Sequence, residues 1–596
     1  MRRKKVNVGI AFSDFVDLGA SSFSDKGRRS NKPFHTPDLL IILPLFILGS
    51  IFSILAFRLF YIQVVQGSYY KNLSNNNRTR TVVIAAPRGI IFDRQGKPLV
   101  RNVPVFEDVK DNKVEILPKA DALKLLSDGK SVTATVSREY LYKSIFAHVL
   151  GYTGQISENE LNHPDFKGYA ATDFVGKMGL EAEYEKILQG QTGRELYEVN
   201  AGGEKTRFLG RQEAIPGGNI DTTLDLDIQT AAAKAFEKIK KGAIVVSDPR
   251  DGGILALYSK PTFDSNLFTH SKSYIPEGDY KDVSSILLDS ENQPLLNRAI
   301  GGAYPPGSTF KLVTATAGLE SNAITPDTIF DDTGQITVGG ATFGNWYFIQ
   351  YGRTEGPLNV LGALKRSNDI FFYKTAQAAG VDTISSWARK LGAGSTLGID
   401  LSGEVPGTVP TVEWKKSTVG EQWYLGDTFN YGIGQGYLLT TPLQVNTWTA
   451  FFANGGTLYQ PHLLKDSKKI LQQNIVDKKN IDLVREGMME ACDTGGVAWP
   501  LFGFKVKNPR LPIDDLNYSK VASDGAAFTR VKLGCKTGTA EIGDIHTSPH
   551  AWITVFAPFY NPEIVVTILV ENGGEGSSIA GPIAKDILTS YFEKKQ

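Results

Sequence analysis

The 596-residue sequence predicts an α+β protein with a single transmembrane helix, a β-rich pedestal and a large C-terminal domain. Three observations predict this organisation: an apolar run from Leu39 to Phe57, alternating β-branched residues from Arg80 to Asn102, and strand patterns at both ends of the C-terminal part. Helical segments separate the early strands of that part from the late ones. We therefore expect one sheet that joins distant parts of the chain.

The first 38 residues are polar and basic, and we expect a disordered tail in the cytoplasm. Leu39 to Phe57 is uncharged, and together with Leu59 to Ile62 it is long enough to cross a bilayer. A buried globular helix is the alternative, and the small-residue cleavage site of a signal peptide is not visible. We expect a transmembrane helix at 39–62 in the inner (cytoplasmic) membrane, with the basic tail inside and the chain after about Val65 outside.

Residues 63–215 predict a pedestal, because their composition is that of a soluble protein and no residue pattern in them indicates catalysis. Arg80 to Asn102 alternates β-branched residues with turn signals, which predicts short strands and hairpins. Asp121 to Leu126 and Met178 to Leu188 are predicted helices, and we expect the charges of the second to lie on an exposed face.

Residues 216–596 predict the α+β domain. Leu224 to Phe236 is an amphipathic helix pattern, and a hairpin is expected to pair Gly242–Ser247 with Gly253–Tyr258. The end of the domain is predicted to contain three strands and a closing helix, at Val531–Lys536, Trp552–Ala557, Ile564–Val570 and Ala580–Phe592.

Composition and charge exclude several classes of function. The formal net charge of +1 gives no reason to expect nucleic acid as a partner. Cys492 and Cys535 are too few for a disulfide framework, so they leave the redox compartment undecided. His546 and His550 are four residues apart, but Pro549 indicates a loop and a third ligand is missing, so we expect no metal site.

The candidate nucleophile lies in the stretch PPGSTFK, where Gly307 precedes Ser308 and a mostly apolar helical run follows. Ser308 is therefore expected near a helix start, beside unpaired first-turn amides. Lys311 lies one turn later on the same face, and a desolvated neutral lysine can take the serine proton. Taken alone, the pair could be an N-cap and a solvated charge. A phosphate-binding loop is excluded, since Ser308 stands where the lysine is required.

Two later motifs strengthen this assignment: Ser367 and Asp369 in LKRSNDIFFYK, and Lys536 in LGCKTGTAE. The order S-x-x-K, S-x-[ND], K-T-G resembles the signature of penicillin-binding proteins and serine β-lactamases. In chemical terms, Ser367 can pass a proton between the lysine base and a leaving amine. Lys536 can hold a substrate carboxylate, and Gly538 allows a substrate backbone to lie against the strand edge.

The resemblance covers nearly the whole chain after the tail. APRGIIFDRQG at 86–96 and the segment at 179–185 are similar to class B penicillin-binding proteins, and GIGQGYLLTTPLQ at 432–444 is similar to their elongation branch, the penicillin-binding protein 2 type. The resemblance implies an antiparallel five-stranded sheet flanked by helices, with an all-helical subdomain and no cofactor. It also implies an oxyanion hole from the backbone amides of Ser308 and Thr539, and substrate binding by Thr537, Gly538 and Thr539.

The chain departs from the family pattern in two places. Asp369 stands where most relatives carry asparagine, which leaves the recognition of a substrate amide open. The pedestal between Asn102 and Gly151 is short, which puts in doubt partner contacts normally made by a larger head.

The resemblance implies a D,D-transpeptidase that cross-links peptidoglycan stem peptides at D-Ala-D-Ala through a serine acyl-enzyme during cell elongation, with β-lactams as inhibitors. It also implies work beside a SEDS-type, RodA-like glycosyltransferase and the elongation machinery. The alternatives are a division-type transpeptidase, a D,D-carboxypeptidase or β-lactamase that uses water as acceptor, and a penicillin-sensing receptor or silent scaffold. The intact Ser308, Lys311 and Lys536 disfavour a silent scaffold.

Overall fold

The computed structural model describes residues 39–130, 132–200, 202, 204–523, 526–543 and 547–595. The expected basic tail and His546 lie outside these residues. The described residues form two compact units, one within 39–80 and 197–208 and the other within 81–196 and 209–595.

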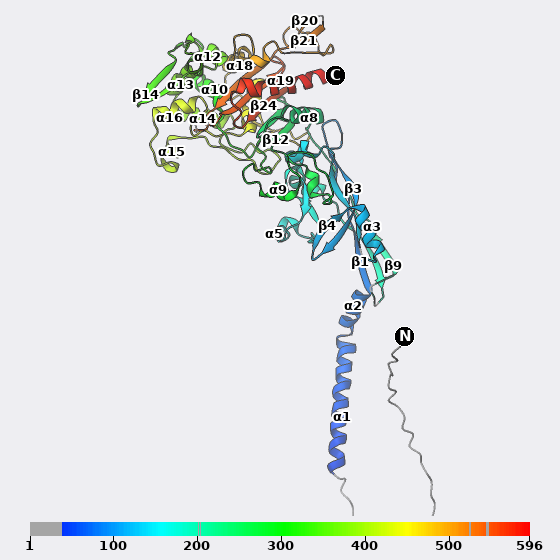
Figure 1. Cartoon of the computed structure of the whole chain (residues 1–596). Helices are drawn as coiled ribbons and strands as arrows, with labels where there is room; N and C mark the ends of the chain where they lie inside the picture. The colour runs from blue at the N-terminus through cyan, green and yellow to red at the C-terminus, as the bar shows by residue number, and fades with distance from the viewer. Residues whose placement is uncertain are drawn as a thin grey trace, which may run out of the picture. The chain divides into compact units, whose positions relative to one another are not determined.

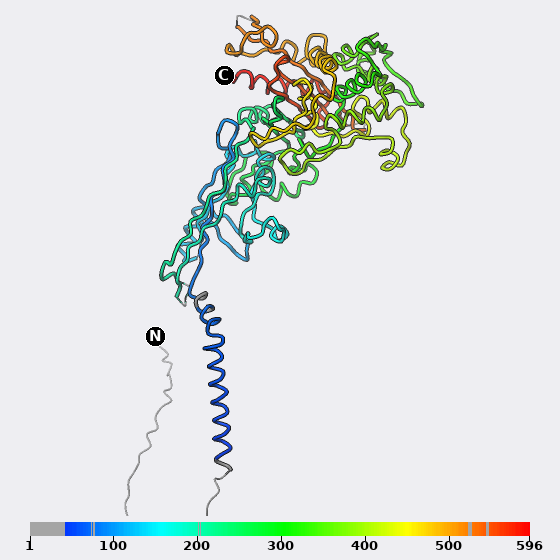
Figure 2. The backbone as a smooth tube through the Cα atoms, turned by 180° about the vertical axis from the view of Figure 1, so that it is seen from behind, coloured from blue at the N-terminus to red at the C-terminus, as the bar shows by residue number. Residues whose placement is uncertain are grey.

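The first unit contains the predicted membrane helix. Helix α1 (Leu39–Phe60) continues through a π-helical turn (Tyr61–Val65), and α2 (Gly67–Arg78) follows (Figures 1 and 2). The segment from Ile42 to Val65 of this unit has 24 residues and a mean hydropathy of 2.2, and none of its most apolar part is buried inside the protein. By length and composition this segment can cross a membrane.

The predicted strands and the first helix of the pedestal are present. Its central strand β3 pairs antiparallel with both β4 and β5. The principal elements are β1 (Thr79–Ile84), β2 (Ile91–Phe92), β3 (Val100–Lys110), β4 (Lys113–Leu117), α3 (Lys119–Ser127), β5 (Thr133–Tyr140), α4 (Ala147–Leu150), β6 (Thr153–Gln155), α5 (Glu158–Leu161), β7 (Phe174–Gly176), α6 (Gly179–Glu183), α7 (Glu185–Leu188), β8 (Gly193–Val199) and β9 (Lys205–Gln212).

The expectation that the charges of the second pedestal helix are exposed holds for Glu183 and Lys186 but is wrong for Glu181 and Glu185. Glu181 and Glu185 are 0% and 6% exposed. Arg88 lies 2.6 Å from Glu181 and 2.5 Å from Glu185, and Arg138 lies 2.6 Å from Glu181. Burial alone raises the pKa of Glu181, but the charges of Arg138 and Arg88 outweigh burial and leave the pKa lowered. Spacing along one helix could not reveal partners that come from distant segments.

The C-terminal domain is built on a five-stranded antiparallel sheet with the order β12-β11-β24-β23-β22. The sheet joins the early hairpin to the late strands, as predicted. Its strands are β11 (Gly242–Ser247), β12 (Ile254–Lys260), β22 (Gly534–Ala540), β23 (His550–Ala557) and β24 (Ile564–Val570). The predicted strand at Val531–Lys536 is instead divided between β21 (Ala526–Val531) and β22. Strand β22 is an edge strand, so one side of its backbone faces away from the sheet.

Helices cover both faces of this sheet (Figure 1). Helices α8 (Leu226–Ala235) and α19 (Gly576–Lys594) pack on one face, where Ile244, Ile553 and Ile568 are buried. Helix α17 (Pro442–Ala453) packs on the other face, with Trp552 and the helix that follows Ser308 in the same core. Successive side chains of a strand point to opposite faces, so each strand contributes to both cores.

The second face carries a mostly helical part with small hairpins. Its helices are α10 (Lys311–Glu320), α11 (Trp346–Tyr351), α12 (Val360–Arg366), α13 (Asp369–Ala379), α14 (Val381–Lys390), α15 (Val412–Thr418), α16 (Leu425–Gly432) and α18 (Lys478–Cys492). Two antiparallel strand pairs accompany them, β13 (Phe330–Asp332) with β16 (Gly356–Leu358) and, between these in the sequence, the hairpin of β14 (Gln335–Val338) with β15 (Ala341–Gly344). A small sheet of β19 (Lys505–Val506), β20 (Tyr518–Ser523) and β21 precedes β22.

The buried ion network of the pedestal gives a testable prediction. Replacing Glu181 by alanine leaves Arg88 and Arg138 buried without their shared carboxylate, so we expect Glu181→Ala to lower the free energy of unfolding by about 3–5 kcal/mol. The control is Arg101→Ala, which removes a largely exposed, solvent-screened ion pair with Glu139 and should change the free energy of unfolding far less. Urea unfolding of the full chain in detergent measures both. Equal losses in the two variants would contradict the network's importance.

Candidate active site

Ser308 lies in a single turn of 3₁₀-helix (Gly307–Phe310) that leads directly into α10. The turn is held on both sides. The indole of Trp552 on β23 donates a hydrogen bond to the carbonyl of Pro305 at 3.0 Å, and the amide of Gly307 donates to the carbonyl of Gly434 at 2.9 Å. The serine is therefore fixed between the sheet and the loop that follows α16.

Two glycines allow β22 to pack directly against this turn. Gly307 has a φ of +54°, and a Cβ there would lie 3.0 Å from the carbonyl oxygen of Thr539. A Cβ at Gly538 would lie 3.0 Å from the carbonyl oxygen of Pro306 and 3.2 Å from the methyl group of Thr309. Gly538, predicted to make room for substrate, thus also makes room for the serine turn.

Ser367 lies at the junction of α12 and α13. It ends α12 in the left-handed conformation, with φ 53° and ψ 37°, which is uncommon outside glycine and often marks functional sites. The side chain of Asn368 caps α13 by accepting a hydrogen bond from the amide of Phe371 at 2.9 Å. Asp369 is then the first residue of α13.

Lys311 is fully buried and contacts both predicted residues of the second motif. Its Nζ donates to the carbonyl oxygen of Ser367 at 2.7 Å, to the Ser367 hydroxyl at 3.4 Å and to Asp369 Oδ1 at 2.6 Å. The other oxygen of Asp369 accepts a hydrogen bond from the amide of Trp346 at 2.9 Å. Both oxygens of Asp369 are therefore occupied within the protein.

Lys536 approaches Ser367 from the opposite side. Its Nζ donates to the Ser367 hydroxyl at 2.7 Å and to the carbonyl oxygen of Thr537 at 2.9 Å, and the side chain is fully buried. Ser367 thus contacts both lysines, whose motifs are far apart in the sequence. In this state Lys536 is not exposed to solvent, so its predicted contact with a substrate carboxylate stays a prediction.

Burial controls the protonation of both lysines. It lowers the pKa of Lys311, and the nearby Asp369 carboxylate opposes that effect only in part. The pKa of Lys536 falls well below its usual value, because burial and the positive charge of Lys311 both disfavour its ammonium form. The site therefore favours a neutral amine, which can accept a proton.

Thr539 presents its backbone to the outer side of β22. Its carbonyl oxygen accepts a hydrogen bond from Gln435 Nε2 at 3.3 Å, so it does not point towards β23. The N–H and C=O groups of one residue in an antiparallel strand point to the same side. The amide of Thr539 therefore also points outward, while its hydroxyl accepts a hydrogen bond from the amide of Gly576 at 3.3 Å.

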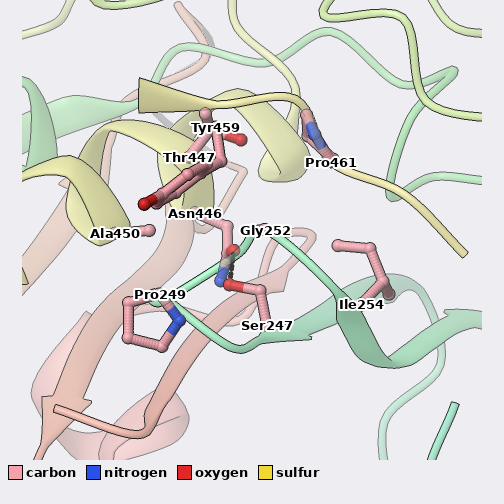
Figure 3. Close-up of a pocket in the computed structure, with 9 residues that line it drawn as sticks. All are labelled: Ser247, Pro249, Gly252, Ile254, Asn446, Thr447, Ala450, Tyr459 and Pro461. Carbon is pink, nitrogen blue, oxygen red and sulfur yellow. Dashed lines mark hydrogen bonds between the residues drawn. The ribbon is translucent and has the colours of Figure 1, made fainter. Parts of the chain in front are cut away.

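A separate small pocket is shown in Figure 3. It is lined by Ser247, Pro249, Gly252, Ile254, Asn446, Thr447, Ala450, Tyr459 and Pro461. Within it, Ser247 donates a hydrogen bond to Asn446 Oδ1 at 2.5 Å. None of the predicted site residues lines this pocket. Across the described ranges, no three His, Cys, Asp or Glu side chains form a group that could hold a metal ion.

The sequence did not point to three features around the site. Trp346 holds Asp369, and Gln435 contacts Thr539, although Gln435 lies inside the GIGQG stretch that resembles the family. Cys492 and Cys535 form a disulfide with a Cα–Cα distance of 5.7 Å, and Cys535 immediately precedes Lys536. Two cysteines 43 residues apart give no sequence signal of pairing.

Comparisons with known families agree with this architecture. The family model described as the penicillin-binding protein transpeptidase domain matches residues 242–589, and that of the penicillin-binding protein dimerisation domain matches residues 106–222. Peptidoglycan D,D-transpeptidase MrdA of Haemophilus influenzae is 32% identical and covers 96% of this chain and 94% of its own length. MrdA of Escherichia coli K12 is also 32% identical, and the match covers 90% of this chain and 91% of the length of MrdA.

Solved structures are similar as well. The penicillin-binding protein PBP2 of Helicobacter pylori, in complex with MreC, has a TM-score of 0.71 and 29% identity, and covers 86% of this chain and 98% of its own. A chain of a peptidoglycan synthase complex, described as coordinating polymerization and crosslinking, has a TM-score of 0.69 and 30% identity, and covers 94% and 99%.

The close packing of the serine turn gives the second prediction. Gly307→Ala adds a methyl group 3.0 Å from the Thr539 carbonyl and should displace the nucleophile, so we expect the rate of acylation by a fluorescent penicillin to fall by roughly 10²-fold. Gly96→Ala is the matched control, because Gly96 also has positive φ but no neighbour within 4 Å of the added methyl. Equal rates for the two variants would show that the contact does not position the serine.

Proposed function

The chain belongs to the class B penicillin-binding proteins of the PBP2 (MrdA) type, peptidoglycan D,D-transpeptidases of cell elongation, and we propose that Ser308 is the nucleophile that forms the acyl-enzyme. The observation that carries the proposal is the contact of Ser367 with both lysines, at 3.4 Å for Lys311 and 2.7 Å for Lys536. Residues of all three motifs, Lys311, Ser367 and Lys536, thereby meet at the Ser367 hydroxyl.

We assign the proton transfers to the lysines and Ser367. Neutral Lys311 takes the proton of the Ser308 hydroxyl as the serine attacks the substrate carbonyl. Ser367 connects Lys311 with Lys536 and can pass that proton to the leaving amine. Of the groups that move protons in this scheme, Asp369 contacts the Lys311 amine, and it acts by holding that amine in place.

The oxyanion of the tetrahedral intermediate is assigned to the amides of Ser308 and Thr539. Two observations support this. Ser308 lies at the start of a helical run, where amides lack intrahelical partners, and the Thr539 amide points outward from an edge strand. A stem peptide that is added along β22 would lie beside Thr537 and Thr539, with its carbonyl oxygen within reach of these amides.

The reaction then follows as two acyl transfers. Ser308 Oγ attacks the carbonyl carbon of D-Ala-D-Ala, the peptide bond breaks, and the terminal D-Ala leaves with a proton from the relay. The amine of a second stem peptide attacks the ester, its proton goes to the relay, and Ser308 regains its own. A β-lactam enters the first step only, because its leaving group stays attached.

The location and partners extend the proposal. We place residues 1–38 in the cytoplasm, the transmembrane helix at 39–62, the pedestal at 63–215 and the transpeptidase domain at 216–596 outside. The basic tail supports this orientation, and the disulfide fits an oxidising compartment. The PBP2 of Helicobacter pylori was solved with MreC, so we propose an MreC-type protein as a partner here. The resemblance to the elongation branch, and the similar chain in a peptidoglycan synthase complex, support a RodA-like glycosyltransferase as a second partner.

Replacing the nucleophile tests the assignment directly. We expect Ser308→Ala to lose covalent labelling by a fluorescent penicillin, because no hydroxyl remains at the start of the turn. Ser578→Ala, which changes a serine in the first turn of α19, should label like the native chain. Labelling of Ser308→Ala at the native level would rule out Ser308 as the nucleophile.

The Lys311–Asp369 pair predicts a shift in pH dependence. Asp369 favours the ammonium form of Lys311, so its charge raises the pH at which the neutral base becomes available. In Asp369→Asn the pKa of Lys311 should fall, and the acidic limb of the acylation rate should move to lower pH by about 1–3 units. Asparagine keeps an oxygen for the Trp346 amide.

The control for this experiment is Asp382→Asn, which removes an exposed carboxylate on α14 and should leave the pH profile unchanged. If the acidic limb of the acylation rate in Asp369→Asn stays at its native pH, or moves to higher pH, Asp369 does not set the protonation of Lys311.

A further inference from the structure

The disulfide between Cys492 and Cys535 lies directly behind the proposed proton relay. Cys535 is fully buried in β22 and immediately precedes Lys536, and Cys492 is the last residue of α18 and is 5% exposed. Successive residues of a strand point to opposite faces. The cross-link therefore holds β22 from the face opposite to the one on which Lys536 meets Ser367.

Helix α18 is also held tightly against α12, the helix that ends at Ser367. Lys365 of α12 lies 2.6 Å from Glu490 of α18. A Cβ at Gly487 would lie 2.6 Å from the side chain of Leu364, so the two helices approach as closely as a glycine permits. In addition, Arg366 donates a hydrogen bond to the carbonyl of Gly495, just after α18, at 3.0 Å.

Helix α18 thus connects the two elements whose side chains must meet in the relay. It contacts the Ser367 side through packing, an ion pair and hydrogen bonds, and it contacts the Lys536 side through a covalent bond. We propose that Cys492 and Cys535 are positioning residues, whose disulfide fixes the distance between Lys536 and Ser367, and that the transpeptidase matures by oxidation of this pair. The inference rests on the proposed function of the relay.

The oxidation is a thiol–disulfide exchange with a protein disulfide of an oxidoreductase outside the cytoplasm. The thiolate of Cys492, the more exposed of the two, attacks one sulfur of the donor disulfide and releases the other as a thiolate. The thiolate of Cys535 then attacks the Cys492 sulfur and releases the second donor thiol. Two protein thiols lose two electrons and two protons, and the donor disulfide becomes a dithiol.

The chain contains only these two cysteines, so their state can be counted directly. Full-length protein extracted from membranes into detergent is denatured and treated with a maleimide of defined mass, before and after reduction. We expect no labelled thiols before reduction and two after it. Two free thiols before reduction would overturn the proposal.

The kinetic test compares oxidised protein with protein treated with dithiothreitol. We expect reduction to lower the second-order rate constant of acylation by a fluorescent penicillin about tenfold, because Lys536 and Ser367 lose their fixed distance. Water that enters the loosened site reduces the effect of burial on the lysines. Their pKa values should rise, and the acidic limb of the rate should move to higher pH.

Two variants separate positioning from general stability. In Cys492→Ser with Cys535→Ser, the rate should be low with or without dithiothreitol. Ile228→Ala weakens α8, which packs on β12 at the opposite edge of the sheet, and should lower the melting temperature without moving the pH profile. If the double variant fails to fold, the comparison of the native chain with and without dithiothreitol still tests the positioning role of the disulfide.

Equal rate constants and superimposable pH profiles for folded oxidised and reduced protein would overturn the positioning role. Failure of the proposed function would give a different result: Ser308→Ala would still be labelled by the fluorescent penicillin, whether the cysteines are oxidised or reduced.

Discussion

The active site depends on one buried chain of contacts, in which Asp369, Lys311, Ser367 and Lys536 follow one another through hydrogen bonds of 2.6 to 3.4 Å. This chain of contacts buries the amines of Lys311 and Lys536 and the carboxylate of Asp369. One carboxylate can balance one ammonium, and a second uncompensated ammonium in a buried site is costly. Burial lowers the pKa of Lys311 despite the carboxylate, and it lowers the pKa of Lys536 well below its usual value. Both amines therefore tend towards the neutral form, which is the state that the proposed base Lys311 requires.

This chain of contacts also explains why the domain is built from distant segments. The turn with Ser308 begins a buried helix, Ser367 ends another, and Lys536 lies on an edge strand. The turn with Ser308 and strand β22 pack so closely that an added Cβ at Gly307 or Gly538 would lie 3.0 Å from a backbone oxygen. A rigid edge strand next to a rigid helix end keeps donors aligned before substrate arrives, so less reorganisation is needed during acyl transfer.

Local pattern predicted the elements well where a strand or helix depends on its own residues. The early hairpin, the last two strands and the closing helix appear where alternation and apolar spacing placed them. Burial and partners were harder to predict, because they depend on remote segments. Glu181 is buried because Arg88 and Arg138 reach it from two other elements, and the two cysteines meet only once α18 lies along β22. The motifs indicated which residues gather at the site, but not that Lys536 would be bound to Ser367.

The central claim is that these elements form a single acyl-transfer site, and the crystal structure of the penicillin acyl-enzyme tests it most directly. The account predicts an ester on Ser308 Oγ, with its carbonyl oxygen within hydrogen-bonding distance of the amides of Ser308 and Thr539. It also predicts that Ser367 remains hydrogen-bonded to Lys536. An adduct on another residue, or an acyl oxygen that points away from both amides, would contradict the account.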